Sequence, residues 1–270
     1  MSHILLPRNR SARRHEQRAQ TVIEFILIFP VMLLLLFGAL QFALIYKAKT
    51  TLNYATFIAA RAATLNNGKR EQVNQAFSRG LSPLYVSFSS GSNVLEKVEA
   101  VHAAREKVLG EIQAGGIVCM ERLNPINEDF GYEIPNHPDV GGPAIPVDNL
   151  VYRESTITSG AHVSIQDATL FKLKVTYCYQ LYVPYLNTVI PKWFLGDPEE
   201  YANDPDATYQ PHLAGIGSFK QSCIANRSIP LTSVAIMRMQ SAVVNEAYVP
   251  AASGSPAIPG EGYETAAQCS

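Results

Sequence analysis

The sequence of 270 residues is poor in charged side chains. Asp, Glu, Lys and Arg make up 17% of it, against about 25% in an average soluble domain. The 22 basic and 23 acidic residues leave a formal net charge of −1. A near-neutral total excludes a basic protein that coats nucleic acid, and it excludes a highly charged disordered chain. We therefore predict no nucleic-acid partner.

The sequence also lacks the short motifs of common enzymes and cofactor sites. It contains no G-x-S-x-G, no P-loop and no G-x-G-x-x-G. The acidic segment 197–209 lacks the ligand spacing and the glycine of an EF-hand, so we interpret it as a solvated loop. Four histidines lie without a zinc-ligand spacing and are predicted to be surface or structural residues: His102, His137, His162 and His212. We predict a protein that is not an enzyme, with no catalytic residue, no cofactor and no metal.

Basic charge and hydrophobicity are both concentrated at the N-terminus. The first 19 residues hold five arginines and one acidic residue, Glu16, for a local charge of +4. The remaining chain has 17 basic and 22 acidic residues, a charge of −5. Phe25 to Ile45 then form the single long apolar run, which contains no charge and is interrupted only by Pro30, Gly38 and Gln41.

The apolar run predicts one transmembrane helix. Its 21 residues would form a helix about 31 Å long, which matches a hydrocarbon core of about 30 Å. Five arginines precede the run and two lysines follow closely, so the positive-inside rule places the N-terminus in the cytoplasm. The alternative is a cleaved secretory signal, whose apolar region is shorter and ends at small residues. Residues 46–49, YKAK, make a poor site of that kind.

A single acidic residue, Glu24, directly precedes the apolar run. A carboxylate at this place is costly unless it lies near lipid headgroups or has a partner. Taken alone, Glu24 would be an interfacial residue that favours the positive end of the helix dipole.

The surrounding residues favour a more specific interpretation. Residues 18–25, RAQTVIEF, resemble the type IV prepilin signal, in which Gly or Ala precedes the cut and Glu is the fifth mature residue. The matching positions are Ala19 before the cut, Gln20 as the first mature residue and Glu24 as the fifth, followed by Phe25. With Pro30 and the small residues that follow the membrane run, the stretch resembles the TadE-like proteins, the pseudopilins of tight-adherence (Tad/Flp) pilus systems. The resemblance implies that Glu24 pairs with a free N-terminal amine during assembly.

The resemblance implies a minor pilin or pseudopilin in pilus assembly or secretion, processed by prepilin peptidase and serving cell adhesion. Its partners would be the inner membrane, prepilin peptidase, other pseudopilins, the major pilin and the inner-membrane platform. The expected location is the bacterial inner membrane, single-pass, with the C-terminal domain in the periplasm. The alternative function is an uncleaved, membrane-anchored periplasmic scaffold or binding protein.

The rest of the chain predicts an α+β fold. Helical spacing extends the membrane helix to about residue 65 and then predicts helices over 69–79 and 94–113. Residues 117–123, 170–182 and 231–244 are predicted strands of an antiparallel sheet, and 124–155 a proline-rich loop. The corresponding segments are a leader (1–19), the membrane helix and its extension (20–65), a helical region (66–115), an α+β domain (116–248) and a flexible tail (249–270).

A stripe of small residues on the extended helix has two interpretations. It is either a packing face for other subunits or a face that packs on the protein's own domain. The stripe consists of Ala48, Leu52, Ala55, Ala59 and Ala62.

All four cysteines lie beyond the membrane run, which favours disulfides in an oxidising compartment over free buried thiols. They are Cys119, Cys178, Cys223 and Cys269. Three pairings are possible, and we favour Cys178 with Cys223, because a strand and a return loop would bring them together.

Overall fold

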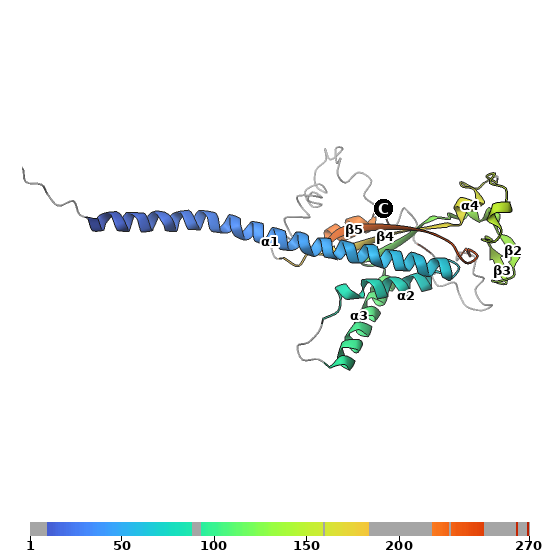
Figure 1. Cartoon of the computed structure of the whole chain (residues 1–270), viewed down its shortest axis with the longest axis horizontal. Coiled ribbons are helices and arrows are strands. Elements are labelled where there is room, and N and C mark those ends of the chain that lie inside the picture. Colours follow the sequence, from blue (N-terminus) through green and yellow to red (C-terminus); the bar gives the residue numbers. More distant parts are fainter. Residues whose placement is uncertain are drawn as a thin grey trace, which may run out of the picture. The chain divides into compact units, whose positions relative to one another are not determined.

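The protein has the α+β architecture that the sequence predicts, with a long N-terminal helix followed by shorter helices and antiparallel sheets (Figure 1). A computed structural model describes residues 10–87, 93–158, 160–183, 218–226 and 228–245 with Tyr263 and Cys269, and its account of side chains begins at Ile23. The chain divides into two compact units, Met1–Leu44 and Ile45–Ser270, each described by itself below.

Helix α1 (Arg10–Leu65) ends where the sequence predicts. Asn67 and Gly68 adopt positive φ angles of 59° and 75°, a conformation that Asn and Gly tolerate. The Gly68 amide donates to the Ala63 carbonyl at 2.9 Å, the six-to-one bond that closes a helix C-terminus.

The small-residue stripe of α1 packs on the protein's own domain. Ala48, Leu52, Ala55 and Ala59 have no exposed surface, and Ala62 is half-buried. The four buried residues join the same hydrophobic cluster as the core residues of the sheet. Their small size lets other elements approach the helix backbone closely, so the structure decides between the two interpretations in favour of internal packing.

Helix α2 (Arg70–Leu81) leads into the short 3-10 helix η1 (Ser82–Leu84). Its apolar face buries Val73, Phe77 and Leu81 completely. The predicted helix over 69–79 is confirmed, with two further residues at its end. Residues 88–92, between α2 and the next helix along the chain, lie outside the described residues.

Helix α3 (Val94–Ala114) confirms the predicted helix over 94–113 and is capped at both ends. The Asn93 amide donates to the Glu96 carboxylate at 3.1 Å as part of a capping box. Gly115 ends the helix at a φ of 68°. Its second half is buried at Val108 and Ile112, but the apolar residues of its first half, Val94 and Val98 among them, are exposed. The helical spacing therefore predicts the helix but overstates the extent of its buried face.

Three strands form the main antiparallel sheet in the order β1-β4-β5. They are β1 (Val118–Asn124), β4 (Leu170–Gln180) and β5 (Ser228–Arg238). The predicted strands over 117–123 and 170–182 are confirmed. The third strand begins and ends earlier than the predicted range of 231–244, because β5 pairs with β4 along its whole length, from Gln180 opposite Ser228 to Leu170 opposite Arg238.

The two faces of the sheet have different surroundings. The inner face carries Leu173, Val175 and Tyr177, which are buried in the same cluster as α1 and α2. The outer face carries Lys174, whose Nζ lies 2.9 Å from Oε2 of Glu121 on the neighbouring strand. This alternation is typical of a strand with one face in the core and one face in solvent.

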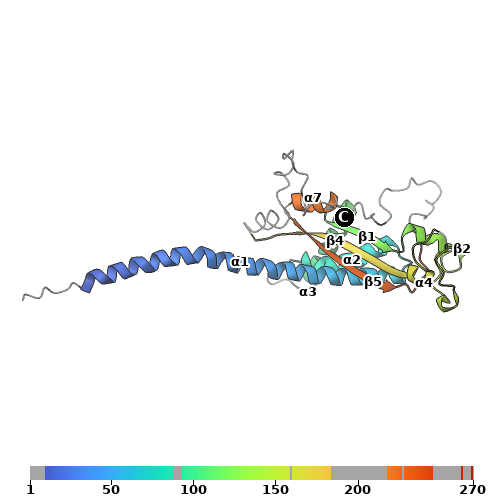
Figure 2. The same cartoon turned by 90° about the horizontal axis from the view of Figure 1, so that it is seen from above.

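Thr176 and Cys178 lie on the outer face but are buried, so they depart from this alternation. Helix α7 (Ser218–Ala225) is joined to this face by the Cys178–Cys223 disulfide. Figure 2 shows α7 and the second half of α1 on opposite sides of the strands. Helix α7, which the disulfide attaches, thus covers a face that the alternation of residues alone would place in solvent.

All four cysteines are paired, which confirms the predicted disulfides and the favoured pair. Cys119 is bonded to Cys269 and Cys178 to Cys223. Cys119 stands opposite Thr176 in the register, so both bonds lie on the outer face. In the range 249–270, predicted as a flexible tail, the described residues are Cys269 and Tyr263, whose hydroxyl donates to the Gly68 carbonyl at 2.8 Å.

Removing one disulfide is expected to lower the free energy of unfolding. The Cys178–Cys223 bond spans 45 residues, and loss of a cross-link over such a loop costs about 2–4 kcal/mol. Urea unfolding of the Cys178→Ala/Cys223→Ala variant, followed by circular dichroism, measures the loss. The control is Ser222→Ala, an exposed neighbour. A double variant that unfolds at the wild-type urea concentration would contradict the expectation.

The predicted loop 124–155 contains a second, smaller sheet. Strands β2 (Ile134–His137) and β3 (Gly142–Ala144) pair antiparallel between the 3-10 helices η2 (Asn127–Tyr132) and η3 (Leu150–Tyr152). The short helix α4 (Ile165–Ala168) follows. Each short strand contains a proline. Proline has no backbone N–H to donate to a neighbouring strand and is uncommon within strands, so the sequence pattern did not indicate β2 or β3. Buried Asp129 orders the region by accepting amide hydrogens from His162 and Ile126, at 2.9 and 3.0 Å.

Candidate functional site

The N-terminal unit presents a long apolar surface. Within the span Ile23–Leu65, an 18-residue window has a mean hydropathy of 2.6; the helix is long and apolar enough to cross a membrane, and it is the only such helix among the described residues. Its most apolar window has no residue buried within the protein. Phe25, Leu27 and Leu35 each expose more than three-fifths of their surface. Exposed apolar surface of this extent indicates contact with lipid or with other proteins.

The predicted processing residues lie on one continuous helix. Ala19 and Gln20 belong to the backbone of α1, and Glu24 is exposed one turn further on. Positions four apart share one face of a helix, so residues 20 and 24 lie on the same face. The Phe25 ring stacks on the Phe29 ring with centroids 5.2 Å apart.

The other predicted membrane-helix residues have varied surroundings. Pro30 lies inside α1, which continues past it. A side chain at Gly38 would meet no atom within 4 Å. Gln41 is buried, and Ile45 is partly buried against the core of the second unit.

The second unit contains a polar cavity of about 360 Å³ between helix α3, the sheet and the Cys178–Cys223 disulfide. The hydroxyls of Tyr85 and Tyr177 lie 3.0 Å apart at its wall, and Lys107 and Glu111 line it. Burial raises the pKa of both tyrosines above the ordinary phenol value. Both phenols therefore stay protonated at neutral pH and are suited to hydrogen bonding rather than to proton abstraction.

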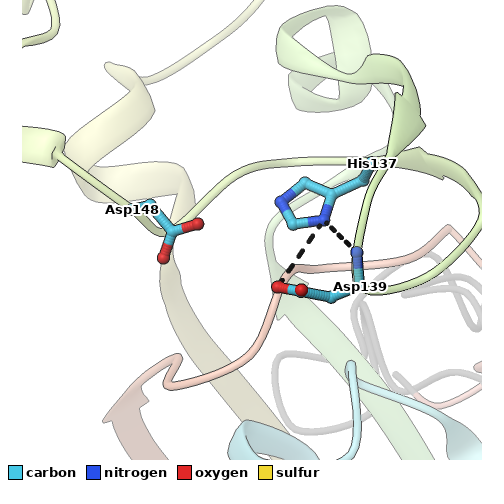
Figure 3. Close-up of side chains that lie close together, drawn as sticks. All are labelled: His137, Asp139 and Asp148. Carbon is cyan, nitrogen blue, oxygen red and sulfur yellow. Dashed lines mark hydrogen bonds and ion pairs between the residues drawn. The ribbon is translucent and has the colours of Figure 1, made fainter.

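The histidines are not equivalent. His102 and His162 are exposed, as predicted for surface residues, and His212 lies outside the described residues. His137 is only 2% exposed and lies beside Asp139 and Asp148, as Figure 3 shows. A sequence motif could not reveal this group, because Asp148 is separated from His137 by the whole of β3.

Glu133, between η2 and β2, has a carboxyl group with a raised pKa. Its Oε1 atom is buried and has no hydrogen-bond partner among the described residues. Loss of hydration on burial raises the pKa of Glu133 above its ordinary value of 4.5. The folded protein therefore holds this proton more tightly than the unfolded chain does.

The raised pKa predicts a pH-dependent effect of Glu133→Gln. Stability conferred by the protonated carboxyl is complete below the ordinary pKa and is lost as the pH rises through the raised pKa. The variant has no carboxyl to ionise, so we expect it to melt at a higher temperature than the wild type at pH 7. The difference should vanish at about pH 4. Thermal unfolding at both pH values tests this, with exposed Glu128→Gln as the control. Equal melting temperatures at pH 7 would refute it.

A comparison with protein families matches residues 19–61 to TadE-like proteins. No curated protein and no solved structure matches the chain significantly. The matched segment begins at Ala19, the predicted residue before the cut, and runs along α1 through Glu24 and the exposed apolar surface. The resemblance read from residues 18–25 is confirmed: over residues 19–61 this chain is similar to TadE-like proteins.

Proposed function

We propose that this protein is a minor pilin or pseudopilin of a tight-adherence (Tad/Flp) pilus assembly or secretion system, and that prepilin peptidase processes it after Ala19. The observation that carries the proposal is the TadE-like match, which begins at Ala19 and covers the membrane helix. The exposed apolar surface of the same helix supports it, because a pilin-like helix must contact lipid before assembly and other subunits afterwards.

The proposed mechanism depends on one new charge. Cleavage would remove the +4 leader and leave a free amine on Gln20. Four residues of helix rise by about 6 Å, so the amine and the Glu24 carboxylate would lie on one face, about one turn apart. Within apolar surroundings each of these charges is costly without a partner. A subunit that supplies its amine to the Glu24 of a neighbour would satisfy both charges, and this would fix the register between their helices.

The proposed location is the bacterial inner membrane, with the N-terminus in the cytoplasm and the second unit in the periplasm. The five leader arginines support this orientation. The two disulfides of the second unit support it independently, because disulfides persist in the periplasm and are rare in the cytosol. Alkaline phosphatase fused to the C-terminus should be active. An inactive fusion, together with a cytoplasmic reporter that is active when fused at the same position, would indicate the opposite orientation.

Deletion of the gene tests the pilus role. We expect cells without the protein to lose tight-adherence pili and surface attachment, and a copy of the wild-type gene to restore both. Normal piliation in the deletion strain would refute the role.

An uncleaved, membrane-anchored periplasmic binding protein is the second candidate. The polar cavity lined by Tyr85, Tyr177, Lys107 and Glu111 favours it, since such a cavity can hold a small polar ligand. This candidate requires the membrane helix only as an anchor, so it predicts that alanine at Glu24 is harmless.

A further inference from the structure

The β2–β3 hairpin and the segment after it bring together a histidine and two carboxylates. His137 ends β2, Asp139 lies in the turn, and Asp148 follows β3. One ligand atom from each of these residues lies within 4.8 Å of the others. Figure 3 shows the imidazole between the two carboxylates, with one ring nitrogen toward Asp139 and the other toward Asp148.

The buried imidazole has an unused nitrogen. Its Nδ1 accepts the Asp139 amide hydrogen at 3.4 Å and lies 3.9 Å from Oδ2 of the same residue. The other nitrogen, Nε2, has no hydrogen-bond partner among the described residues. A polar atom of a side chain that is only 3% exposed normally has a partner. Nε2 is therefore available to a ligand, and metal binding there would place the ring proton on Nδ1, on the side of the Asp139 carboxylate.

Arg153 is a cationic neighbour of this group, because its Nε donates to the Asp148 backbone carbonyl at 3.1 Å. Among the described residues, no lysine or arginine forms an ion pair with either carboxylate. Asp139 and Asp148 are both exposed, and three-quarters of the Asp139 side chain is accessible. The two carboxylates and the imidazole together offer oxygen and nitrogen donor atoms to one cation.

We propose that His137, Asp139 and Asp148 bind a divalent transition metal, with Zn²⁺ as the best fit. Zinc takes imidazole nitrogen and carboxylate oxygen together, whereas Ca²⁺ and Mg²⁺ favour oxygen alone. Tetrahedral bonds of about 2.0–2.2 Å place ligand atoms about 3.4 Å apart. The ligand atoms now lie within 4.8 Å of one another, so metal binding would require the two exposed aspartates to rotate toward the buried imidazole. Water would fill the fourth position.

The bound metal would cross-link the small sheet. Its ligands come from both sides of β3, and the residue that follows β3, Ile145, exchanges backbone hydrogen bonds with Val243 at 2.8 and 3.0 Å. Zinc would thus fasten the hairpin turn to the segment that connects it with the main core. This is a structural role, and it is independent of the proposed pilus function.

Zinc titration of the full chain in detergent micelles tests the proposal. The protein is stripped with a chelator and titrated with Zn²⁺ by calorimetry. We expect the wild type to have a site that His137→Asn and Asp148→Ala each weaken at least tenfold. The controls His162→Asn and Glu128→Ala, which alter exposed residues outside the group, should bind as the wild type does.

Asp148→Ala keeps the test valid if the buried His137 variant fails to fold, because the Asp148 side chain is exposed. Circular dichroism verifies that each variant is folded. Zinc should also raise the melting temperature of the wild type and of His162→Asn, but not that of Asp148→Ala. Equal zinc affinity in Asp148→Ala and the wild type would overturn the proposal, as would a wild type that binds no zinc.

Discussion

Replacing Glu24 with alanine is expected to abolish pilus assembly while leaving the protein in the membrane. Removing one partner of a buried ion pair costs about 3–5 kcal/mol. At about 1.4 kcal/mol for each factor of ten, every subunit contact would weaken by more than about a hundredfold. The apolar helix itself is unchanged, so membrane insertion should be normal. Electron microscopy of surface pili and membrane fractionation measure the two outcomes.

The control for this variant is Glu16→Ala. Glu16 lies in the segment that cleavage would discard, so its loss should not affect the mature subunit. Normal pili in the Glu24→Ala strain would contradict the amine–carboxylate contact and favour the uncleaved binding protein. Loss of the protein from the membrane would assign Glu24 to insertion instead of assembly.

The second large effect is expected at Gly80, where α2 crosses α1. A Cβ atom at this position would lie 2.6 Å from Cα of Ala55 and 2.7 Å from Cδ1 of Ile58. The first of these is a backbone atom, so the helices must separate to accept a side chain. Overpacking of a close contact costs about 1–3 kcal/mol. Gly80→Ala should therefore lower the melting temperature by several degrees.

Gly110→Ala is the matched control. Gly110 also lies within a helix, α3, but a Cβ atom there would meet nothing within 4 Å. In a helix interior, alanine is more favourable than glycine by about 1 kcal/mol. Gly110→Ala should therefore be as stable as the wild type or more stable. Thermal unfolding of both variants should give shifts of opposite sign. A Gly80→Ala protein as stable as Gly110→Ala would refute the close crossing.

Glu24 and Gly80 illustrate what the sequence could and could not predict. Glu24 and its spacing from residue 19 form a local pattern, so they can be recognised without a structure. Gly80 carries no local signal, because its importance comes from Ala55, which is distant in the sequence. The small-residue stripe was an intermediate case. Its helical spacing was clear, but only the structure shows that the protein's own domain covers it.

The same distinction applies to the rest of the fold. Helices α1, α2 and α3 and strands β1 and β4 are long enough for their periodicity to predict them. Strands β2 and β3 are short and contain proline. The neighbouring helix η2 is fixed by a contact distant in the sequence, between buried Asp129 and the His162 amide. The group of His137 with two aspartates was not predicted for a related reason. Its side chains come from separate points along the chain and meet only because the β2–β3 hairpin folds back on itself.

The central claim is that prepilin peptidase cuts this chain after Ala19, and the most direct test is N-terminal sequencing of the protein purified from membranes. In cells with an active peptidase, the account predicts a mature chain that begins at Gln20. Cells that lack the peptidase should give a chain that begins at Met1. A chain that retains Met1 in the presence of the active enzyme would contradict the account.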